Sequence, residues 1–294
     1  MPLEESLPLA RLAEKTNYSR IWLGEDLNGR DVFAYLSVLS SETEKIQIGT
    51  GITSPFVRNW AVIANSCAGI QSLSQGRFIL GLGVGGIPEI SAAIGHKPKG
   101  IVSKMEKAVL FLKKVLKGEE ATINSWYARI RNFSLAVSVA PPQIYLGVRG
   151  PRMLALAGRV ADGVIFSGPP KYLREAVNIV DDAAEDAGRD PFEIDKVVWN
   201  PFVLVEKEED IALAADMVDV MLPSMPPLAK KHLEGLGKNE LLSNICICGD
   251  FEEIKDQLTD YSRMGFSEIV VGPPYGREPE RTLKTLGEVY GLRN

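Results

Sequence analysis

The sequence has few residues of the kinds that bind metals or form disulfides. Its 294 residues include only three cysteines and two histidines. The cysteines are Cys67, Cys246 and Cys248, and the Cys-x-Cys pair has neither a second pair nor a nearby histidine, so it lacks the pattern of a zinc site. We therefore predict that the cysteines pack in the interior, that no metal is bound, and that the protein works in the reducing cytoplasm.

Long hydrophobic runs and a surplus of basic residues are also missing. No uninterrupted apolar stretch approaches the roughly 20 residues of a membrane-spanning helix. The first seven residues contain two Glu and no basic residue, unlike a secretory signal peptide. The 33 Lys and Arg are outnumbered by 38 Asp and Glu, giving a net charge of −5, whereas nucleic acids are bound by clustered positive charge. We expect a small molecule, and neither a membrane nor a nucleic acid, as the partner.

What the sequence does contain is an alternating pattern in an ordinary globular composition. Hydrophobic residues make up 45% and charged residues 24%, close to the average of soluble domains. Short apolar runs alternate with amphipathic segments, which is typical of parallel βαβ units. Single α/β barrels commonly have about 250 residues, so we predict one barrel domain over residues 1–294. The predicted strands are residues 20–23, 46–50, 78–82, 143–147, 163–167, 197–205 and 268–272.

The predicted helices have recognisable ends, and three stretches interrupt the alternation. Asp31 and Asn59 are suited to N-cap the helices that follow them, and Gly76 lies past the end of the second. Asp250 and Glu253 have the spacing of a capping box. Loops as long as the interrupting stretches usually border the substrate entrance of a barrel. They are a Gly- and Pro-rich segment at about 84–100, a hairpin at 121–140, and a long, partly helical insertion at 206–244.

The beginning of the chain departs from a regular eight-stranded barrel. The pattern predicts a helix over residues 4–16, where the first strand would come, and only seven strands are predicted in all. Three explanations are open: a start codon assigned too late, closure of the barrel by another segment, or an open barrel completed by a partner.

Two adjacent carboxylates follow the first predicted strand. The active site of an α/β barrel lies at the C-terminal ends of its strands, and Glu25 and Asp26 occupy such a place. Neighbouring carboxylates can divide the roles of proton donor and electrostatic partner, because their mutual repulsion favours protonation of one. The alternative is a polar loop that caps the next helix. We take Glu25 and Asp26 as the candidate catalytic residues.

Glycines follow the second and third predicted strands. Gly51 lies in the segment GTGITSPFVR, residues 49–58, where glycine permits a close approach of the backbone to a flat ligand. A tight strand-to-helix turn is an equally good interpretation. Residues 81–86, which include Gly83 and Gly85, satisfy a dinucleotide fingerprint only in part, so they are a weak nucleotide motif.

A further segment, between a predicted strand and a predicted helix, has an anion-binding pattern. Backbone N–H groups at the start of a helix bind anions, and Pro151 is suited to the first helical position. Two arginines add positive charge. We favour a phosphate site over a purely structural turn for these residues, which are Gly147, Val148, Arg149, Gly150, Pro151 and Arg152.

Taken in this order, the segments resemble the luciferase-like flavin and deazaflavin oxidoreductases, and especially the methylenetetrahydromethanopterin reductases. The resemblance runs from Leu9 to about Ser167. It implies an α/β fold, a (β/α)8 TIM barrel of the luciferase-like type, here with insertions and an apparently missing first strand. It also implies hydride transfer between the deazaflavin coenzyme F420 and a small substrate, with methylenetetrahydromethanopterin as the first candidate. The segments that carry it are residues 22–26, 51–58, 74–83 and 147–151.

The resemblance also implies where the coenzyme lies. The ring would lie over the end of the barrel, backed by a non-proline cis peptide bond between Gly51 and Ile52. Thr53 and Ser54 would approach its polar edge, although the reductases often have Asn at the place of Ser54. Many relatives have His where this chain has Asp26, so a histidine-based proton relay is not expected. The candidate cofactor-binding residues are Gly51, Ile52, Thr53, Ser54, Gly83, Gly85 and, for the phosphate, the six residues 147–152.

Two alternatives to the F420-dependent function are open. The first is an FMN-dependent monooxygenase of the same fold, which reacts with oxygen and receives reduced flavin from a partner. The second is a non-catalytic barrel that binds a flavin without turnover. The family also implies a homodimer formed through the helices at about 31–41 and 59–74.

Overall fold

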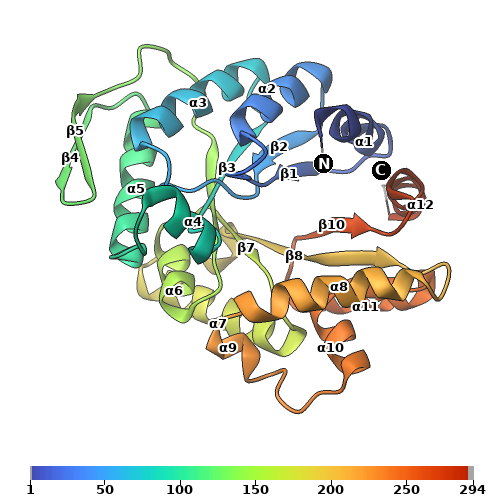
Figure 1. Cartoon of the computed structure of the whole chain (residues 1–294). Coiled ribbons are helices and arrows are strands. Elements are labelled where there is room, and N and C mark those ends of the chain that lie inside the picture. The colour runs from blue at the N-terminus through green and yellow to red at the C-terminus, as the bar shows by residue number, and fades with distance from the viewer. Residues whose placement is uncertain (1, 291–294) are drawn as a thin grey trace. The chain divides into compact units, whose positions relative to one another are not determined.

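The computed structural model describes residues 2–290, and its chain divides into two compact units. Unit 1 comprises Met1–Gly147 and Val160–Asp162, and unit 2 comprises Val148–Arg159 and Gly163–Asn294. Both units contain parallel strands with helices between them (Figure 1). The single domain over residues 1–294 stays a prediction.

Four parallel strands form the sheet of unit 1, in the order β1-β2-β3-β6. Leu23 at the end of β1 lies beside Thr50 at the end of β2, and Gly83 at the end of β3 lies beside Gly147 at the end of β6. The residues that follow these strands are therefore brought to one edge of the sheet. The strands are β1 (Arg20–Leu23), β2 (Gln47–Thr50), β3 (Phe78–Gly83) and β6 (Gln143–Gly147), as the sequence predicted to within one residue at each end.

The capped helices of unit 1 begin at the predicted residues, whereas the helix at Ile87–Ile94 was not predicted, because the Gly and Pro residues at 84–100 indicated a loop. One carboxylate oxygen of Asp31 accepts hydrogen bonds from two backbone N–H groups in the first turn of α2, and Asn59 caps α3 in the same way. Gly76, with φ +90°, follows the end of α3. The hairpin predicted at 121–140 is confirmed by antiparallel pairing of β4 (Ala121–Ser125) and β5 (Ala128–Phe133). The helices are α1 (Leu3–Lys15), α2 (Val32–Glu42), α3 (Trp60–Leu73), α4 (Ile87–Ile94) and α5 (Ile101–Leu116).

The first element is a helix, as predicted, and no strand precedes α1 in residues 2–290. Glu14 ties α1 to the loop before β2, because its Oε1 accepts hydrogen bonds from the N–H groups of Glu44, Lys45 and Ile46 at 2.9, 2.7 and 3.0 Å. Burial favours a higher pKa for Glu14, but these three hydrogen bonds and the charge of Arg77 outweigh it, so the pKa is lowered. The helix is thus anchored through an ionised side chain.

Unit 2 is built around the long strand β8. The strand order is β7-β8-β10, and β9 pairs with the last three residues of β8. The three predicted strands of this unit are confirmed, whereas β9 was not predicted. The strands are β7 (Gly163–Phe166), β8 (Asp195–Leu204), β9 (Ile247–Gly249) and β10 (Glu268–Tyr275).

The helices of unit 2 include those of the predicted insertion at 206–244, which is partly helical as expected. Asp250 and Glu253 form the predicted capping box, each accepting a hydrogen bond from the other's backbone N–H at 2.9 Å. The helices are α6 (Pro151–Val160), α7 (Pro170–Asp186), α8 (Asp210–Met221), α9 (Pro227–Lys230), α10 (Lys238–Ile245), α11 (Phe251–Arg263) and α12 (Pro279–Tyr290), with short 3-10 helices η1 (Pro191–Glu193) and η2 (Leu222–Ser224).

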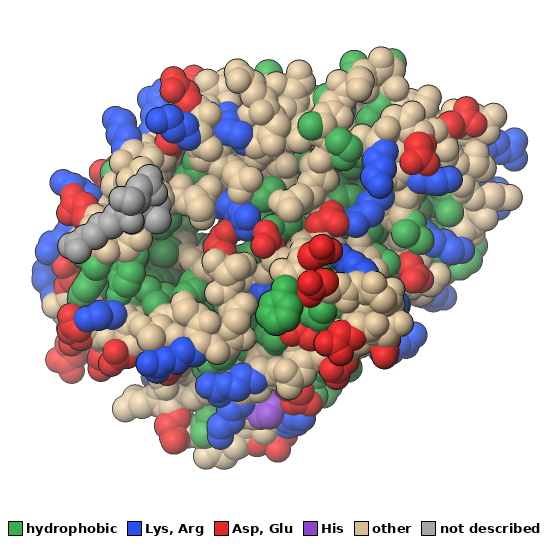
Figure 2. Space-filling model, turned by 180° about the vertical axis from the view of Figure 1, so that it is seen from behind, with side chains coloured by type: hydrophobic (Ala, Val, Ile, Leu, Met, Phe, Trp, Pro, Cys, Tyr) green, Lys and Arg blue, Asp and Glu red, His purple; other side chains and the backbone are tan. Residues whose placement is uncertain are grey.

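The three cysteines are free thiols, of which Cys67 and Cys246 are buried, as predicted, and Cys248 is half-buried. Burial raises the pKa of Cys246 to about 12 and that of Cys248 to about 11. Across residues 2–290 no cluster of His, Cys, Asp and Glu side chains is suited to hold a metal ion. Among the same residues, no helix has the length and hydrophobicity needed to span a membrane. Acidic and basic side chains are interspersed on the face drawn in Figure 2.

Candidate active site

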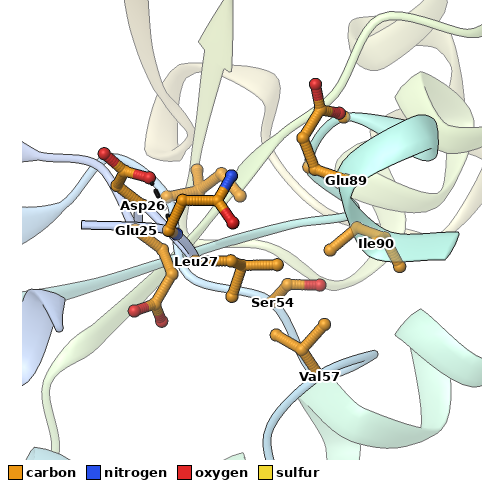
Figure 3. Close-up of a pocket in the computed structure, with 11 residues that line it drawn as sticks. Glu25, Asp26, Leu27, Ser54, Val57, Glu89 and Ile90 are labelled. Atoms are coloured by element: carbon orange, nitrogen blue, oxygen red, sulfur yellow. Dashed lines mark hydrogen bonds between the residues drawn. The ribbon is translucent and has the colours of Figure 1, made fainter. Parts of the chain in front are cut away.

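A pocket of about 160 Å³ lies in unit 1, where β1, β2 and β3 end. Pockets for whole drug-sized ligands have about 300–1,000 Å³, so this one encloses only part of a larger ligand. Three of its side chains are acidic and none is basic (Figure 3). The lining residues are Glu25, Asp26, Leu27 and Asn28 after β1, Ile52, Ser54 and Val57 after β2, and Gly85, Gly86, Glu89 and Ile90 after β3.

The turn after β2 contains the cis peptide bond implied by the family resemblance, between Gly51 and Ile52. The Ile52 side chain packs against the ends of β3 and β6. A Cβ atom on Gly83 would lie 2.9 Å from Ile52 Cδ1, and one on Gly147 would lie 2.7 Å from Ile52 Cγ2. These two glycines therefore make room for Ile52, which lines the pocket.

The hydroxyl groups of the next two residues are bonded within the protein. Thr53 Oγ1 donates to Glu25 Oε2 at 2.8 Å, and Ser54 Oγ donates to the carbonyl oxygen of Val84 at 2.9 Å. Ser54 Oγ also accepts a hydrogen bond from the N–H of Phe56 at 3.3 Å. Both side chains are buried. In this arrangement the two hydroxyl groups fix the turn, and their protons are not free for a ligand.

Glu25 is held by four hydrogen bonds to its carboxylate. Arg58 donates from Nε to Oε2 at 2.6 Å and from Nη2 to Oε1 at 2.8 Å, which is a bidentate pair. Thr53 and the N–H of Val32 supply the other two. The backbone N–H of Glu25 donates to the carbonyl oxygen of Ile52 at 2.9 Å. Glu25 thus ties the end of β1 to the start of α2 and to the cis peptide turn.

Arg58 also contacts a second carboxylate, with Nη2 lying 2.8 Å from Asp31 Oδ2. The hydrogen bond to Glu25 raises the pKa of Arg58 against the effect of burial, and Asp31 adds to the rise. Burial favours a higher pKa for Asp31, but the hydrogen bonds from Arg58 and from the N–H groups of Ala34 and Phe33 outweigh it and lower the pKa. Arg58 therefore remains a cation between two carboxylates. Arg58 is the last residue of the segment 49–58, and no local sequence pattern indicates its two partners.

The other two acidic side chains of the pocket are exposed. Asp26 Oδ1 accepts a hydrogen bond from the N–H of Asn28 at 3.1 Å, and Asp26 pairs with Arg30 through the backbone. Glu89 lies in the first turn of α4, and sequence reasoning missed it because its segment was taken as a loop. Figure 3 shows the carboxyl groups of Glu25 and Asp26 pointing in different directions, with Glu89 on the opposite wall.

Arg149 is the main cationic group of the predicted phosphate segment and lies in unit 2. Partial burial of its guanidinium group lowers the pKa of Arg149. Nη1 lies 3.4 Å from the hydroxyl oxygen of Ser224, and the Tyr172 hydroxyl donates to the Arg149 carbonyl oxygen. No carboxylate of the described residues forms an ion pair with Arg149. Arg149 is therefore a half-exposed residue, and its positive charge has no carboxylate partner within residues 2–290.

The neighbours of Arg149 have the predicted places in the chain. Val148 is buried just after β6, and α6 begins at Pro151 with Arg152 exposed in its first turn. A Cβ atom on Gly150 would meet no atom within 4 Å. The space before the first turn of α6 is therefore open to a ligand.

Parallel strands alternating with helices, and a pocket where three of the strands end, define an α/β protein with a pocket at the place where α/β barrels bind their ligands. The sequence matches the family described as "Luciferase-like monooxygenase" over residues 1–268. The chain belongs to this family, which confirms the resemblance drawn from its motifs.

Three similar proteins define the fold further. The chain is 29% identical to the 5,10-methylenetetrahydromethanopterin reductase of Methanolobus tindarius, over 95% of this chain and 93% of the relative. The coenzyme F420 dependent tetrahydromethanopterin reductase of Methanopyrus kandleri superimposes with a TM-score of 0.84 at 23% identity, covering 98% of this chain and 94% of that one. An F420-dependent secondary alcohol dehydrogenase in complex with an F420-acetone adduct gives a TM-score of 0.86 at 18% identity, covering 100% and 96%. The predicted fold class, a (β/α)8 TIM barrel of the luciferase-like type, is confirmed.

Proposed function

We propose that this chain is an oxidoreductase that uses coenzyme F420 to transfer a hydride to or from a small substrate. The observation that carries the proposal is the pocket at the ends of β1, β2 and β3, beside the turn of Ile52 and Thr53 that Glu25 and Arg58 hold in place. Proteins with F420-dependent activities are similar to this chain over nearly its full length. When bound, the deazaflavin supplies or accepts the hydride at its carbon 5.

The residues of unit 1 fit one end of a flat, largely apolar ring. Leu27, Val57 and Ile90 supply apolar walls, and Gly85 has φ +85°, a conformation that favours glycine. Among the cofactor-binding candidates of this unit, Ile52, Ser54 and Gly85 line the pocket directly, while Gly51, Thr53, Gly83 and Gly147 shape the turn and its support.

The segment from Gly147 to Arg152 is our proposal for the phosphate site of the coenzyme. Arg149 lacks a carboxylate partner among the described residues, and partly buried arginines bind phosphate through charge-assisted hydrogen bonds. The first turn of a helix also has backbone N–H groups without partners inside the helix. Val148 and Pro151 set the backbone, and Gly150 leaves the approach open.

Glu25 and Asp26 remain the catalytic candidates that follow from the sequence. Glu25 orients the turn that carries Ile52 and Thr53, whereas Asp26 borders the pocket with a carboxylate that is exposed. A carboxyl group at this place can exchange the proton that accompanies a hydride.

A pterin-bound one-carbon unit is the first candidate substrate, and another carbonyl or imine compound is the second. The pocket has three carboxylates and no cation. Carboxylates accept hydrogen bonds from N–H groups, and an aminopyrimidinone ring such as that of a pterin offers several. The relative from Methanolobus tindarius is named for such a substrate.

We further infer a homodimer formed through α2 and α3, and a cytoplasmic location, which the three free thiols suit. The two helices pack on each other. α3 contains no charged residue, and Glu42 is the only one in α2. Val62 and Leu73 on α3 are 52% and 50% exposed. A surface helix without a charged face usually packs against another surface.

The proposed function is tested by titrating the purified protein with oxidised F420 and, separately, with FMN, followed by fluorescence quenching in one buffer. We expect micromolar binding of F420 and no binding of FMN at the same concentrations. A preference for FMN would assign the chain to the monooxygenases of this family. Binding of neither would overturn the proposal in favour of a non-catalytic barrel.

A further inference from the structure

Two of the three carboxylates of the pocket are engaged by the protein itself. Both oxygens of Glu25 accept hydrogen bonds, from Arg58, Thr53 and the N–H of Val32. Each oxygen of Glu25 already accepts two hydrogen bonds, so a proton on either oxygen would have to displace at least one of them. Asp26 is bonded within its own turn. Glu25 therefore acts as a positioning residue, and a different group is better placed for proton transfer.

Glu89 lines the pocket from the start of α4. It is the third residue of α4, whose N-cap is Gly86. A Cβ atom on Gly86 would collide with Glu89 Oε2 and lie 2.8 Å from its Cδ, so the carboxyl group fills the space beside this glycine. Within residues 2–290, no side chain or backbone N–H is bonded to the carboxyl group of Glu89. Both oxygens are therefore open to a hydrogen bond from a ligand.

Resting on the F420-dependent activity proposed above, we propose that Glu89 is a further catalytic residue, whose carboxyl group exchanges the proton that accompanies the hydride. Reduction of a C=N or C=O bond adds a hydride to carbon and a proton to nitrogen or oxygen. Both hydrogens come from the reduced coenzyme, which returns to its oxidised form, so no other reductant is needed. Glu89 would give its proton to the substrate nitrogen or oxygen, and the reduced coenzyme, when bound, would supply both the hydride and the proton that restores Glu89. In the oxidative direction the same transfers run in reverse.

The central variant is Glu89→Gln, which keeps the size of the side chain and removes its titrating proton. We expect kcat to fall about 100-fold or more, the usual contribution of a general acid or base, while the Kd for F420 stays close to that of the unmodified protein. The pH–rate profile should lose one limb. The control variant Glu5→Gln, in α1 and outside the pocket lining, should keep that limb.

A second measurement does not depend on turnover. F420 is anionic, so its binding favours protonation of a carboxylate in the pocket. Calorimetric titration with F420 in two buffers of different ionisation enthalpy measures this proton uptake. The other titratable groups near the pocket are Asp26, Glu25 and Asp31, of which the last two contact Arg58. We expect the uptake to disappear in Glu89→Gln and to persist in Asp26→Asn.

Two further variants separate a catalytic role from a structural one. Glu5 is an exposed glutamate at the third position of α1, as Glu89 is in α4, so Glu5→Gln loses the same interaction with a helix N-terminus. It should leave kcat and proton uptake unchanged. Gly86 has φ −65°, which alanine also adopts. Gly86→Ala should displace the flexible carboxyl group of Glu89 and lower kcat although Glu89 is intact.

The outcomes distinguish the two proposals. Loss of kcat and of proton uptake in Glu89→Gln, a lower kcat in Gly86→Ala and an unchanged Glu5→Gln would support the role of Glu89. If Glu89→Gln keeps the kcat of the unmodified protein, or if Asp26→Asn rather than Glu89→Gln abolishes proton uptake, the role of Glu89 is refuted. If the unmodified protein does not bind F420, the proposed function itself fails, and this is seen before any variant is made.

Discussion

Arg58 is the residue on which the ion-pair network of the site depends. The Glu25 side chain is 7% exposed and that of Arg58 is 21% exposed, so Arg58→Ala leaves a nearly buried carboxylate without its cation. Removing one partner of a buried pair costs about 3–5 kcal/mol, and the partial exposure of Arg58 reduces the expected loss to about 2–3 kcal/mol. Urea unfolding of the ligand-free protein measures it.

The conservative variant Arg58→Lys refines this prediction. A lysine keeps the positive charge but cannot donate two parallel hydrogen bonds to Glu25. We expect a stability between those of the unmodified protein and Arg58→Ala, together with weaker F420 binding, because the turn of Ile52 and Thr53 loses its fixed support. An unfolding midpoint for Arg58→Ala equal to that of the unmodified protein would show that the network does not stabilise this unit.

Glu14 provides a prediction about pH at the same scale. Its pKa is lowered in the folded protein by three backbone hydrogen bonds and by Arg77, in spite of burial. A lowered pKa contributes stability that is complete above the unfolded value of about 4.3 and is lost as the pH falls through the folded value. Glu14→Gln should therefore be less stable than the unmodified protein at pH 7, and the difference should shrink below about pH 4. Urea unfolding at both pH values tests this, and a difference independent of pH would contradict it.

At the scale of elements, the ends of β3 and β6 depend on glycine because Ile52 packs between them. A Cβ atom on Gly147 would lie 2.7 Å from Ile52 Cγ2, so Gly147→Ala should cost about 1–3 kcal/mol, as overpacking of an interior does. It should also weaken F420 binding through the displaced turn.

A double-mutant cycle shows whether Ile52 is the cause. In an Ile52→Ala background the clashing methyl group is gone, so Gly147→Ala should cost clearly less than it does in the unmodified protein. Equal costs in both backgrounds, measured by chemical unfolding, would mean that the strain lies elsewhere.

The elements that were predicted correctly are those that local sequence patterns determine. The predicted caps Asp31 and Asn59 and the strands of unit 1 agree with the structure because helix capping and strand periodicity act within a few residues. β9 was missed because it has three residues, too few to show a period, and it is a strand only because it pairs with β8.

The candidate site likewise contains features that could be proposed from the sequence and features that could not. Glu25 and the cis bond after Gly51 could be proposed from their places after strands and from the family resemblance. The bond between Arg58 and Glu25 joins residues 33 positions apart, and no local pattern indicates such a pair. Glu89 was missed because Gly and Pro residues at 84–100 suggested a loop, whereas Pro88 lies in the first turn of α4, where proline is well tolerated.

At the scale of the whole molecule, the uncharged outer face of α2 and α3 leads to a prediction about assembly. Val62 is 52% exposed on α3, and at a dimer interface an aspartate there would be a buried charge without a partner, which costs several kcal/mol per ion. Val62→Asp should therefore convert the dimer to a monomer, as measured by light scattering during size-exclusion chromatography. Val220 on α8 is 68% exposed and lies in unit 2, outside the proposed interface, so Val220→Asp is the matched control and should leave the mass unchanged. A dimer that survives Val62→Asp, or a monomer in the unmodified protein, would show that this face is not the interface.

If Val62→Asp is a monomer, an F420 titration of this variant tests whether the pocket of one chain is sufficient for binding. We expect it to be sufficient, because the residues that line the pocket all come from unit 1.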